Sequence, residues 1–221
     1  MVECRELPLE SGFPMTRSAS YGQVERLTAV DRLGVWLSRR QVVTRVGDVS
    51  GKRVGDFGCG FHARLGLELA ASASHVTLVD VAVADYVKQH PRVTAIEGAL
   101  PDTMGKIPDA SLDVTLCISV LEHLWEAQEM LNELRRVTAP GGVCALSVPG
   151  WLDKPFLEFT AFRLGIQPDE MDDHKRYYGI RDLWPMLRQA GFLPHAISCR
   201  RYKLATSVFA VCRVDPGNPV Q

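Results

Sequence analysis

Apolar and polar positions along the chain alternate between two kinds of pattern. Continuous short apolar runs, which are typical of buried strands, predict strands at residues 53–57, 75–79, 93–97, 113–120 and 143–148. Segments between them place apolar residues at helical spacing and predict helices at residues 63–73 and 126–137. Strands that alternate with helices indicate βαβ units and a mostly parallel sheet.

The two ends of the chain add elements of a different kind. Residues 24–46 predict an amphipathic helix, with one stripe formed by Leu27, Val30, Leu33 and Leu37. A helix is predicted at residues 181–190, with Gly191 as its stop. Two further strands, at residues 196–199 and 207–213, are predicted to pair antiparallel at a sheet edge.

Composition and charge restrict the class of protein. The 221 residues are 46% hydrophobic and carry a formal net charge of -1, which is ordinary for one globular domain and gives no bulk attraction to nucleic acid or to an anionic membrane. No apolar run approaches the ~18 residues that a bilayer span needs. The N-terminus lacks the apolar stretch of a signal peptide. We therefore expect no nucleic-acid partner, no membrane span and a cytoplasmic location.

The cysteines point to the same compartment. Six are scattered along the chain, with no Cys-x-x-Cys pair and no histidine at zinc-ligand spacing, so no metal is expected. Cys117, Cys144 and Cys212 lie within apolar runs and are interpreted as small buried hydrophobes. This usage is typical of a reducing compartment.

A glycine loop follows the first predicted strand. Gly58-Cys59-Gly60 leads into a helix, and Gly58-x-Gly60-x-x-Ala63 also matches the dinucleotide fingerprint. Asp56 argues against a dinucleotide ligand, because a carboxylate there would repel a pyrophosphate at the helix N-terminus. It would suit a ligand with an ammonium group and no phosphate, such as S-adenosylmethionine. Asp80, at the end of the second strand, is placed to accept ribose hydroxyls, although it is also a common turn residue.

Further motifs extend this pattern over residues 50–150. They are DFGCG at 56–60, Asp80, DASLDV at 109–114, VLEHL at 120–124, LRRV at 134–137 and PGG at 140–142. On these residues the chain resembles the class I S-adenosylmethionine-dependent methyltransferases, of the small-molecule, type 11-like kind. The resemblance implies S-adenosylmethionine as cofactor, S-adenosylhomocysteine as product and no metal.

The resemblance also implies a set of cofactor-binding residues. The first segment would cradle the methionine end, Asp80 the ribose and residues 97–100 the adenine. The full set is Asp56, Gly58, Cys59, Gly60, Asp80, Val81, Gly98, Ala99, Leu100, Ile118, Ser119 and Glu122. Two residues depart from the family pattern: His62 replaces a third glycine, and Ala99 stands where an acidic residue often reads the adenine amino group. Asp102 is a candidate substitute for the latter.

The acceptor is expected to be a small molecule or glycan, methylated at oxygen, and a general base would help that reaction. His123 and His174 are the catalytic candidates, with Glu122 and Tyr178 behind them. His123 could instead fix a neighbouring loop, and His174 could belong to a polar loop. The apolar residues 151–165 are either a cap on the sheet or a wall for the acceptor. Arg17 and Tyr21 could fold over the cofactor.

Together these features predict an α/β, Rossmann-like fold with a seven-stranded mixed sheet, mostly parallel with an antiparallel edge strand. A single domain, 1–221, is expected to comprise an N-terminal helical segment (1–50), a cofactor-binding core (51–149), a lid or acceptor insertion (150–180), and a C-terminal helix with edge strands (181–213). The alternatives are a nicotinamide-dependent oxidoreductase and a non-catalytic binding module; Asp56 argues against the first, and Asp56 with Asp80 against the second.

Overall fold

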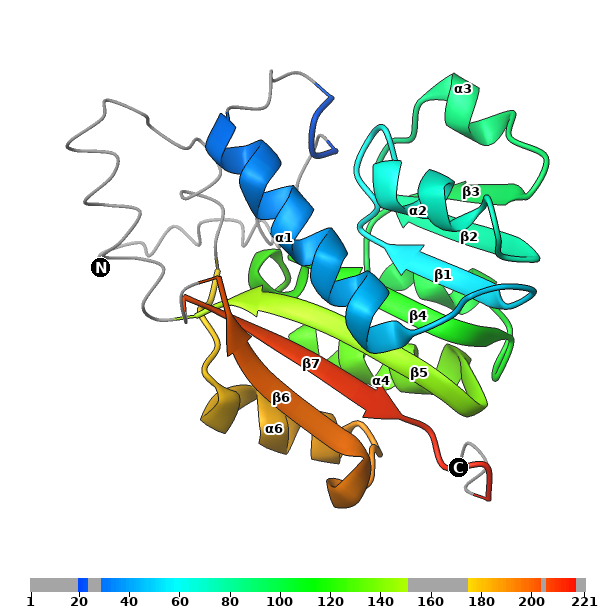
Figure 1. Cartoon of the computed structure of the whole chain (residues 1–221). Coiled ribbons are helices and arrows are strands. Elements are labelled where there is room, and N and C mark those ends of the chain that lie inside the picture. The colour runs from blue at the N-terminus through cyan, green and yellow to red at the C-terminus, as the bar shows by residue number, and fades with distance from the viewer. Residues whose placement is uncertain (1–19, 24–28, 151–174, 204–205, 218–221) are drawn as a thin grey trace, which may run out of the picture.

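A seven-stranded sheet forms the centre of the molecule (Figure 1). The computed structural model describes residues 20–23, 29–150, 175–203 and 206–217. The strands, in chain order, are β1 (Arg53–Phe57), β2 (His75–Asp80), β3 (Val93–Glu97), β4 (Leu112–Ile118), β5 (Thr138–Pro149), β6 (Ile197–Tyr202) and β7 (Ser207–Arg213).

The sheet order is β3-β2-β1-β4-β5-β7-β6. Strands β1 to β5 pair in parallel, and β7 runs antiparallel to both β5 and β6. The predicted fold class, a Rossmann-like mixed sheet that is mostly parallel, is confirmed. The antiparallel strand β7 lies one place inside the sheet, and β6 forms the edge.

Helices cover both faces of the sheet, as parallel strands require (Figure 1). They are α1 (Ala29–Val46), α2 (Arg64–Leu69), α3 (Asp85–Lys88), α4 (Ala127–Val137) and α6 (Ile180–Gln189), with 3₁₀ turns at Asp102–Lys106, Leu121–His123 and Pro194–Ala196. One core layer contains Val42 of α1, Leu69 of α2 and Val87 of α3. The opposite layer contains Leu134 of α4 and Leu183 of α6.

Buried cysteines fill parts of this core. Cys117, Cys144 and Cys212 are fully buried on β4, β5 and β7, which confirms the interpretation of these residues as small hydrophobes. Burial raises the pKa of each thiol, so these sulfurs stay protonated and unreactive.

The inner face of the first helix differs from the prediction. Leu33, part of the predicted stripe, is 56% exposed, whereas Ser38, Val42 and Val46 are buried. The segment carries apolar residues on two sides, so their spacing alone does not select which side packs on the sheet. Leu27 and the side chain of Val30 lie outside the described residues.

The Pro140-Gly141-Gly142 sequence was expected to precede a strand at 143–148. The strand β5 instead begins at Thr138, and pairing with β4 jumps from Leu112↔Thr138 to Val114↔Val143. Gly141 has φ +78°, and a Cβ on Gly142 would lie 2.7 Å from the Ala139 carbonyl oxygen. The glycines therefore form a bulge within the strand. The predicted helix at 63–73 is also shorter, because Ala63 is left-handed and the helix ends at Leu69.

Candidate functional site

The parallel strands β1, β2 and β4 end at the same edge of the sheet (Figure 1). Adjacent pairing brings the segments after Phe57, Val79 and Cys117 side by side. Ligands bind at this edge in open α/β sheets, where the loops leave the strands. Most of the predicted cofactor residues lie here.

The glycine loop after β1 is folded tightly against the neighbouring segments. Gly58 has φ +75°, and a Cβ there would lie 2.2 Å from Val120 Cγ2. Its N–H donates to the Val79 carbonyl at 2.7 Å, which fixes the loop to β2. Gly60 has φ +74°. Glycine is therefore required at Gly58 both by the backbone conformation and by the close approach of Val120.

Asp80 holds this loop through its carboxylate. Oδ2 accepts a hydrogen bond from the Gly60 N–H at 2.8 Å, and Oδ1 accepts one from the Val81 N–H at 2.8 Å. Oδ1 also accepts from the hydroxyl of Ser20. Asp80 therefore orders the loop in the free protein and presents its carboxylate at the end of β2.

The segment before α1 lies on the glycine loop, and whether Tyr21 covers the cofactor stays a prediction. The Phe61 N–H donates to the Tyr21 carbonyl at 3.0 Å, and Ala82 N–H donates to Ser20 Oγ at 3.0 Å. Ser20 is 5% exposed. Sequence reasoning missed Ser20 because a lone serine in an irregular segment carries no spacing signal. Arg17 lies outside the described residues.

Asp56 is buried on β1 directly behind the loop. Its side chain is 3% exposed, and Oδ2 lies 3.4 Å from the position of a Cβ on Gly66. Burial first, and the negative charge of Asp80 second, raise the pKa of Asp56 to about 7. No basic side chain within the described residues forms an ion pair with it. A cation that entered here would be strongly favoured by the ionised carboxylate.

The loop after β3 has its own constraint. Gly98 has φ +154°, and a Cβ there would lie 2.3 Å from Thr103 Oγ1. Thr103 Oγ1 donates to the Ala99 carbonyl at 2.6 Å, and Leu100 is buried. Asp102 is exposed at the first residue of the following 3₁₀ turn. The structure thus places Gly98, Ala99 and Leu100 in one fixed loop beside β2.

The segment after β4 completes the edge. Ser119 has a left-handed backbone with φ +56°, unusual for a residue with a side chain, and its N–H donates to the Ser147 carbonyl at 2.9 Å. Ile118 and Cys59 are half-buried. Burial raises the pKa of the Cys59 thiol, so it is neutral, and it donates a weak hydrogen bond to the Gly60 carbonyl at 3.5 Å.

The catalytic candidates are not all described. His123 is half-buried at the end of the 3₁₀ turn after β4, while Glu122 beside it is 1% exposed. Tyr178 is 3% exposed within the core, and burial raises its pKa. Buried positions suit Glu122 and Tyr178 less well to acceptor contact. His174 lies outside the described residues.

His62, the first departure from the family pattern, has a partner outside the loop. Its Nδ1 lies 3.1 Å from the Tyr86 hydroxyl, and the two rings stack at 6.1 Å between centroids. His62 therefore joins the glycine loop to α3.

Among the described residues, no group of three or more histidine, cysteine, aspartate or glutamate side chains is arranged to hold a metal ion. In the same residues, no helix combines the length and apolar character that crossing a bilayer needs.

Comparison with known proteins identifies the domain. The methyltransferase domain family matches residues 55–146. A protein of Mycolicibacterium smegmatis named "Probable S-adenosylmethionine-dependent methyltransferase" is 30% identical over 71% of this chain and 59% of its own length. Residues 55–146 are a methyltransferase domain, and the chain resembles the class I S-adenosylmethionine-dependent methyltransferases. The ubiquinone biosynthesis O-methyltransferase of Aeromonas salmonicida is 26% identical to it over 76% of this chain and 74% of that protein.

Solved structures share the fold of this methyltransferase domain. The S-adenosylmethionine-dependent methyltransferase of Mesorhizobium loti aligns with a TM-score of 0.57 and 17% identity, over 80% of this chain and 96% of that one. The [4+2]-cyclase SpnF aligns with a TM-score of 0.58 and 18% identity, over 90% and 85%. Because a protein titled a cyclase has the same architecture, the fold by itself does not specify the reaction. The chain spans less than two thirds of the mycobacterial relative.

The residues at the sheet edge fit S-adenosylmethionine. Asp56 is a buried carboxylate without a cationic partner among the described residues, which suits the ammonium of the methionine end. Asp80 ends β2, where ribose hydroxyls are accepted in nucleotide-binding α/β folds. A Cβ at Gly58 would collide with Val120, so the loop backbone packs closely against the segment after β4. The methyltransferase domain thus supplies matching chemistry for both ends of the cofactor.

Proposed function

We propose that the protein transfers a methyl group from S-adenosylmethionine to an oxygen of a small-molecule or glycan-type acceptor. The observation that carries this proposal is the pair of carboxylates, Asp56 and Asp80, on either side of a glycine loop. A bound cation would offset both the repulsion between the two carboxylates and the cost of burying Asp56 in its charged form. The name of the Aeromonas O-methyltransferase supports oxygen as the acceptor atom.

In this proposal each residue has a binding or orienting role. Asp56 binds the ammonium, Asp80 accepts the ribose hydroxyls, and Gly98, Ala99 and Leu100 line the adenine. Ile118, Ser119, Val81, Cys59 and Glu122 complete the pocket. When bound, the cofactor supplies a methyl group on a sulfonium, which is a good leaving group. The protein then has mainly to align the acceptor oxygen with that methyl group and to exclude water.

Acceptor chemistry is assigned to the segments after β4 and β5. His123, half-buried after β4, is proposed as the base that takes the acceptor hydroxyl proton, with His174 as the second candidate. The Lys175 and Arg176 N–H groups donate to the Glu122 carbonyl at 2.7 and 3.4 Å. These bonds join the end of the 150–180 insertion to the His123 turn, which supports a role for that insertion in covering the acceptor.

The dinucleotide alternative fails on charge in this proposal. A pyrophosphate at the start of α2 would approach Asp56, whose pKa is raised first by burial and second by the negative charge of Asp80. Bringing two further negative charges to the same place would oppose binding.

The deciding experiment is calorimetric titration of the full-length protein with S-adenosylhomocysteine and, separately, with NADH. We expect binding of the first and none of the second. NADH binding alone would overturn the assignment of Asp56. Binding of S-adenosylhomocysteine without turnover on any phenolic, carboxylic or sugar hydroxyl acceptor would indicate a non-catalytic module.

The base is tested separately with His123→Asn. We expect kcat to fall about 10²- to 10⁴-fold on a hydroxyl acceptor, with S-adenosylhomocysteine affinity unchanged, because general-base catalysis contributes rate and not cofactor binding. His75→Asn is the matched control. His75 is the first residue of β2, at the end of the strand away from the proposed site, and its side chain bonds Thr94 of β3. An unchanged pH–rate profile in His123→Asn would exclude the role.

A further inference from the structure

The outward face of α1 carries exposed apolar side chains, which is unusual for a helix that packs on a sheet. Leu33, Trp36 and Val43 are 56%, 47% and 51% exposed, and they share one side of the helix with Arg40. The opposite side, with Val42 and Val46, is buried against the sheet. We name Leu33, Trp36, Arg40 and Val43 the α1 outer face.

Basic side chains surround this face. Arg40 stacks over the Trp36 ring with its guanidinium carbon 5.7 Å from the centroid. Arg39 pairs with Glu68 on the α2 side. A groove between the two helices is lined by Trp36, Arg39, Arg40, Val43, Thr44 and Glu68. Arginine beside exposed aromatic and aliphatic residues is typical of helices that lie in a membrane interface.

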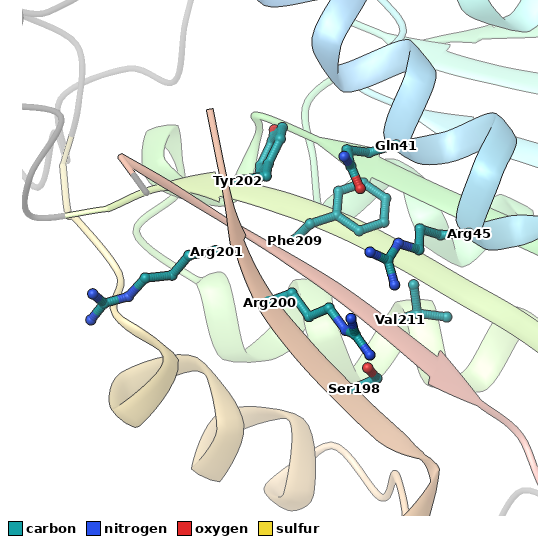
Figure 2. A pocket seen from close by; sticks show the side chains of 8 residues that line it. All are labelled: Gln41, Arg45, Ser198, Arg200, Arg201, Tyr202, Phe209 and Val211. Atoms are coloured by element: carbon teal, nitrogen blue, oxygen red, sulfur yellow. The ribbon is translucent and has the colours of Figure 1, made fainter. Parts of the chain in front are cut away.

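On the other flank of α1, a shallow pocket adds two further arginines. Arg45 of α1 and Arg200 of the edge strand β6 project toward Val211, with Gln41 and Ser198 beside them (Figure 2). Arg201 points away from this group (Figure 2). Within the described part of the chain, neither Arg45 nor Arg200 forms an ion pair. Two such guanidiniums beside an amide and a hydroxyl can bind a phosphate oxygen.

We propose that the α1 outer face docks on an anionic lipid bilayer, and that Arg45 and Arg200, on the flank of α1, add attraction to its headgroup phosphates. Leu33, Trp36 and Val43 enter the boundary between headgroups and acyl chains, and the arginines contact anionic headgroups. Charge complementarity selects this occupant: among the side chains that the structure describes, the nearby carboxylates are Glu68, which is already paired, and Asp48 beyond the helix end, which is bonded to Ser50.

The chemistry of the face opposes two other occupants. A second copy packed on it by two-fold symmetry would set the arginines of one face against those of the other, because an isologous interface pairs a patch with itself. A nucleic acid would engage the arginines and leave Leu33 and Val43 without an apolar partner. A bilayer satisfies both kinds of side chain.

The test is co-flotation of the full-length protein with vesicles of phosphatidylcholine, with and without phosphatidylglycerol. We expect binding only when phosphatidylglycerol is present, and weaker binding at high salt. Arg40→Gln and Arg200→Gln should each weaken binding about 5-fold. Trp36→Ser/Val43→Ser should weaken it by at least ~10-fold. These side chains are exposed, so the melting temperature should not change.

Matched controls lie on the opposite side of the sheet. The control variants are Trp184→Ser and Arg181→Gln, on α6, where Trp184 is 38% exposed and Arg181 is also exposed. Both should bind vesicles as the unmodified protein does. Failure to float with anionic vesicles, or equal loss in the control variants, would overturn the proposal. So would light scattering that shows a dimer dissociated by Trp36→Ser/Val43→Ser, because the face would then be an interface between copies. The proposal stands apart from the methyl-transfer assignment, which the calorimetric titration tests.

Discussion

Asp56 combines a proposed role in cofactor binding with a cost to stability. Burial and the charge of Asp80 raise the pKa of Asp56 to about 7, far above the ~3.9 of a free aspartate. The folded protein therefore holds this proton at pH values where the unfolded chain has released it. The stability that Asp56 contributes is fully present below about pH 4 and is lost as the pH rises through about 7. A bound ammonium would reverse this cost.

The affinity for S-adenosylhomocysteine should therefore depend on pH through Asp56. As the pH falls below ~7 the carboxylate becomes protonated and loses its attraction for the ammonium. The Kd should therefore rise by up to about tenfold for each unit by which the pH falls. Calorimetric titrations between pH 5 and 8, in steps of ~1 pH unit, measure the Kd at each pH. Asp56→Asn should bind weakly, with a Kd that does not change across this pH range. A pH dependence that remained in this variant would assign the titration to another group.

Asp80 should be the larger contributor to affinity. Its carboxylate accepts a hydrogen bond from the Gly60 N–H and is proposed to accept hydrogen bonds from two ribose hydroxyls. Asp80→Ala removes charge-assisted bonds worth about 1.5–3 kcal/mol each, so the Kd should rise roughly 10- to 100-fold or more. Asp85→Ala, in the neighbouring helix α3, is the control, since Asp85 is exposed and pairs only weakly with Lys88. Unchanged affinity in Asp80→Ala would refute the ribose assignment.

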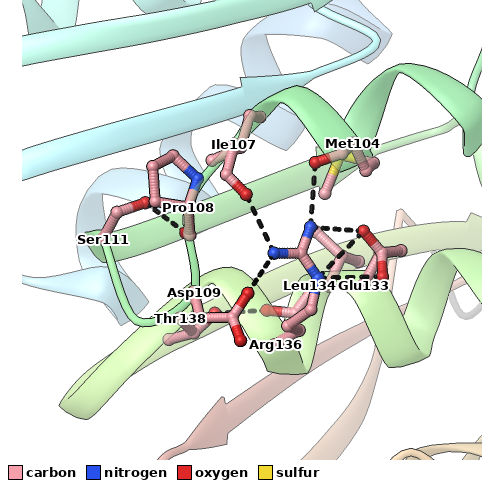
Figure 3. A network of polar contacts seen from close by, with 9 residues as sticks. All are labelled: Met104, Ile107, Pro108, Asp109, Ser111, Glu133, Leu134, Arg136 and Thr138. Atoms are coloured by element: carbon pink, nitrogen blue, oxygen red, sulfur yellow. Dashed lines mark hydrogen bonds and ion pairs between the residues drawn. The ribbon is translucent and has the colours of Figure 1, made fainter.

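At the scale of elements, one side chain fixes the segment that follows the β3 loop. Arg136 of α4 donates to the Ile107 and Met104 carbonyls at 2.8 Å each, and pairs with Glu133 and Asp109 (Figure 3). These carboxylates raise the Arg136 pKa above its usual value. Because Met104 belongs to the 3₁₀ turn that carries Thr103, Arg136 supports the loop of Gly98 and Ala99 from the opposite side.

Arg136→Lys tests this support. Lysine keeps the charge but cannot reach two carbonyls and a carboxylate with one ammonium, so we expect a loss of about 1–3 kcal/mol in the free energy of unfolding. Urea denaturation measures it. Arg181→Lys on the exposed surface of α6 should change the free energy by less than ~0.5 kcal/mol. Equal values for the two variants would show that the network contributes nothing specific.

The elements that could be predicted are those set by local pattern. Strands β1 to β4 and helix α4 were predicted to within a few residues because apolar runs and helical spacing are local signals. The inner face of α1 was not, because its burial depends on where the sheet packs. The bulge at Gly141 was not predicted either, because only the pairing of β5 with β4 shows that the strand continues through the glycines. The placement of Asp56, Gly58 and Asp80 around strand ends could be predicted because it follows from the strand pattern, and their role in cofactor binding stays a prediction. Ser20 could not be predicted because it reaches Asp80 only through the folded chain.

At the scale of the whole molecule, the proposed ligand joins segments that are distant in sequence. The β1 and β2 ends, the Gly98 loop, the β4 turn and the Ser20 segment all meet at one sheet edge. A ligand that contacts them together binds only the folded state and must therefore stabilise the entire fold.

Thermal melting with S-adenosylhomocysteine should show this coupling. At a ligand concentration about 100 times the Kd, the stabilisation is about 2.7 kcal/mol, which corresponds to a rise of roughly 5–10 °C in Tm for a chain of this length. Asp56→Asn should behave in the opposite sense at pH 8: without ligand it should melt higher than the unmodified protein, because no buried charge is formed, and the same ligand concentration should shift it less. An Asp56→Asn protein that melts lower without ligand would mean that the ionised carboxylate is satisfied within the fold. Its role as the ammonium site would then be lost.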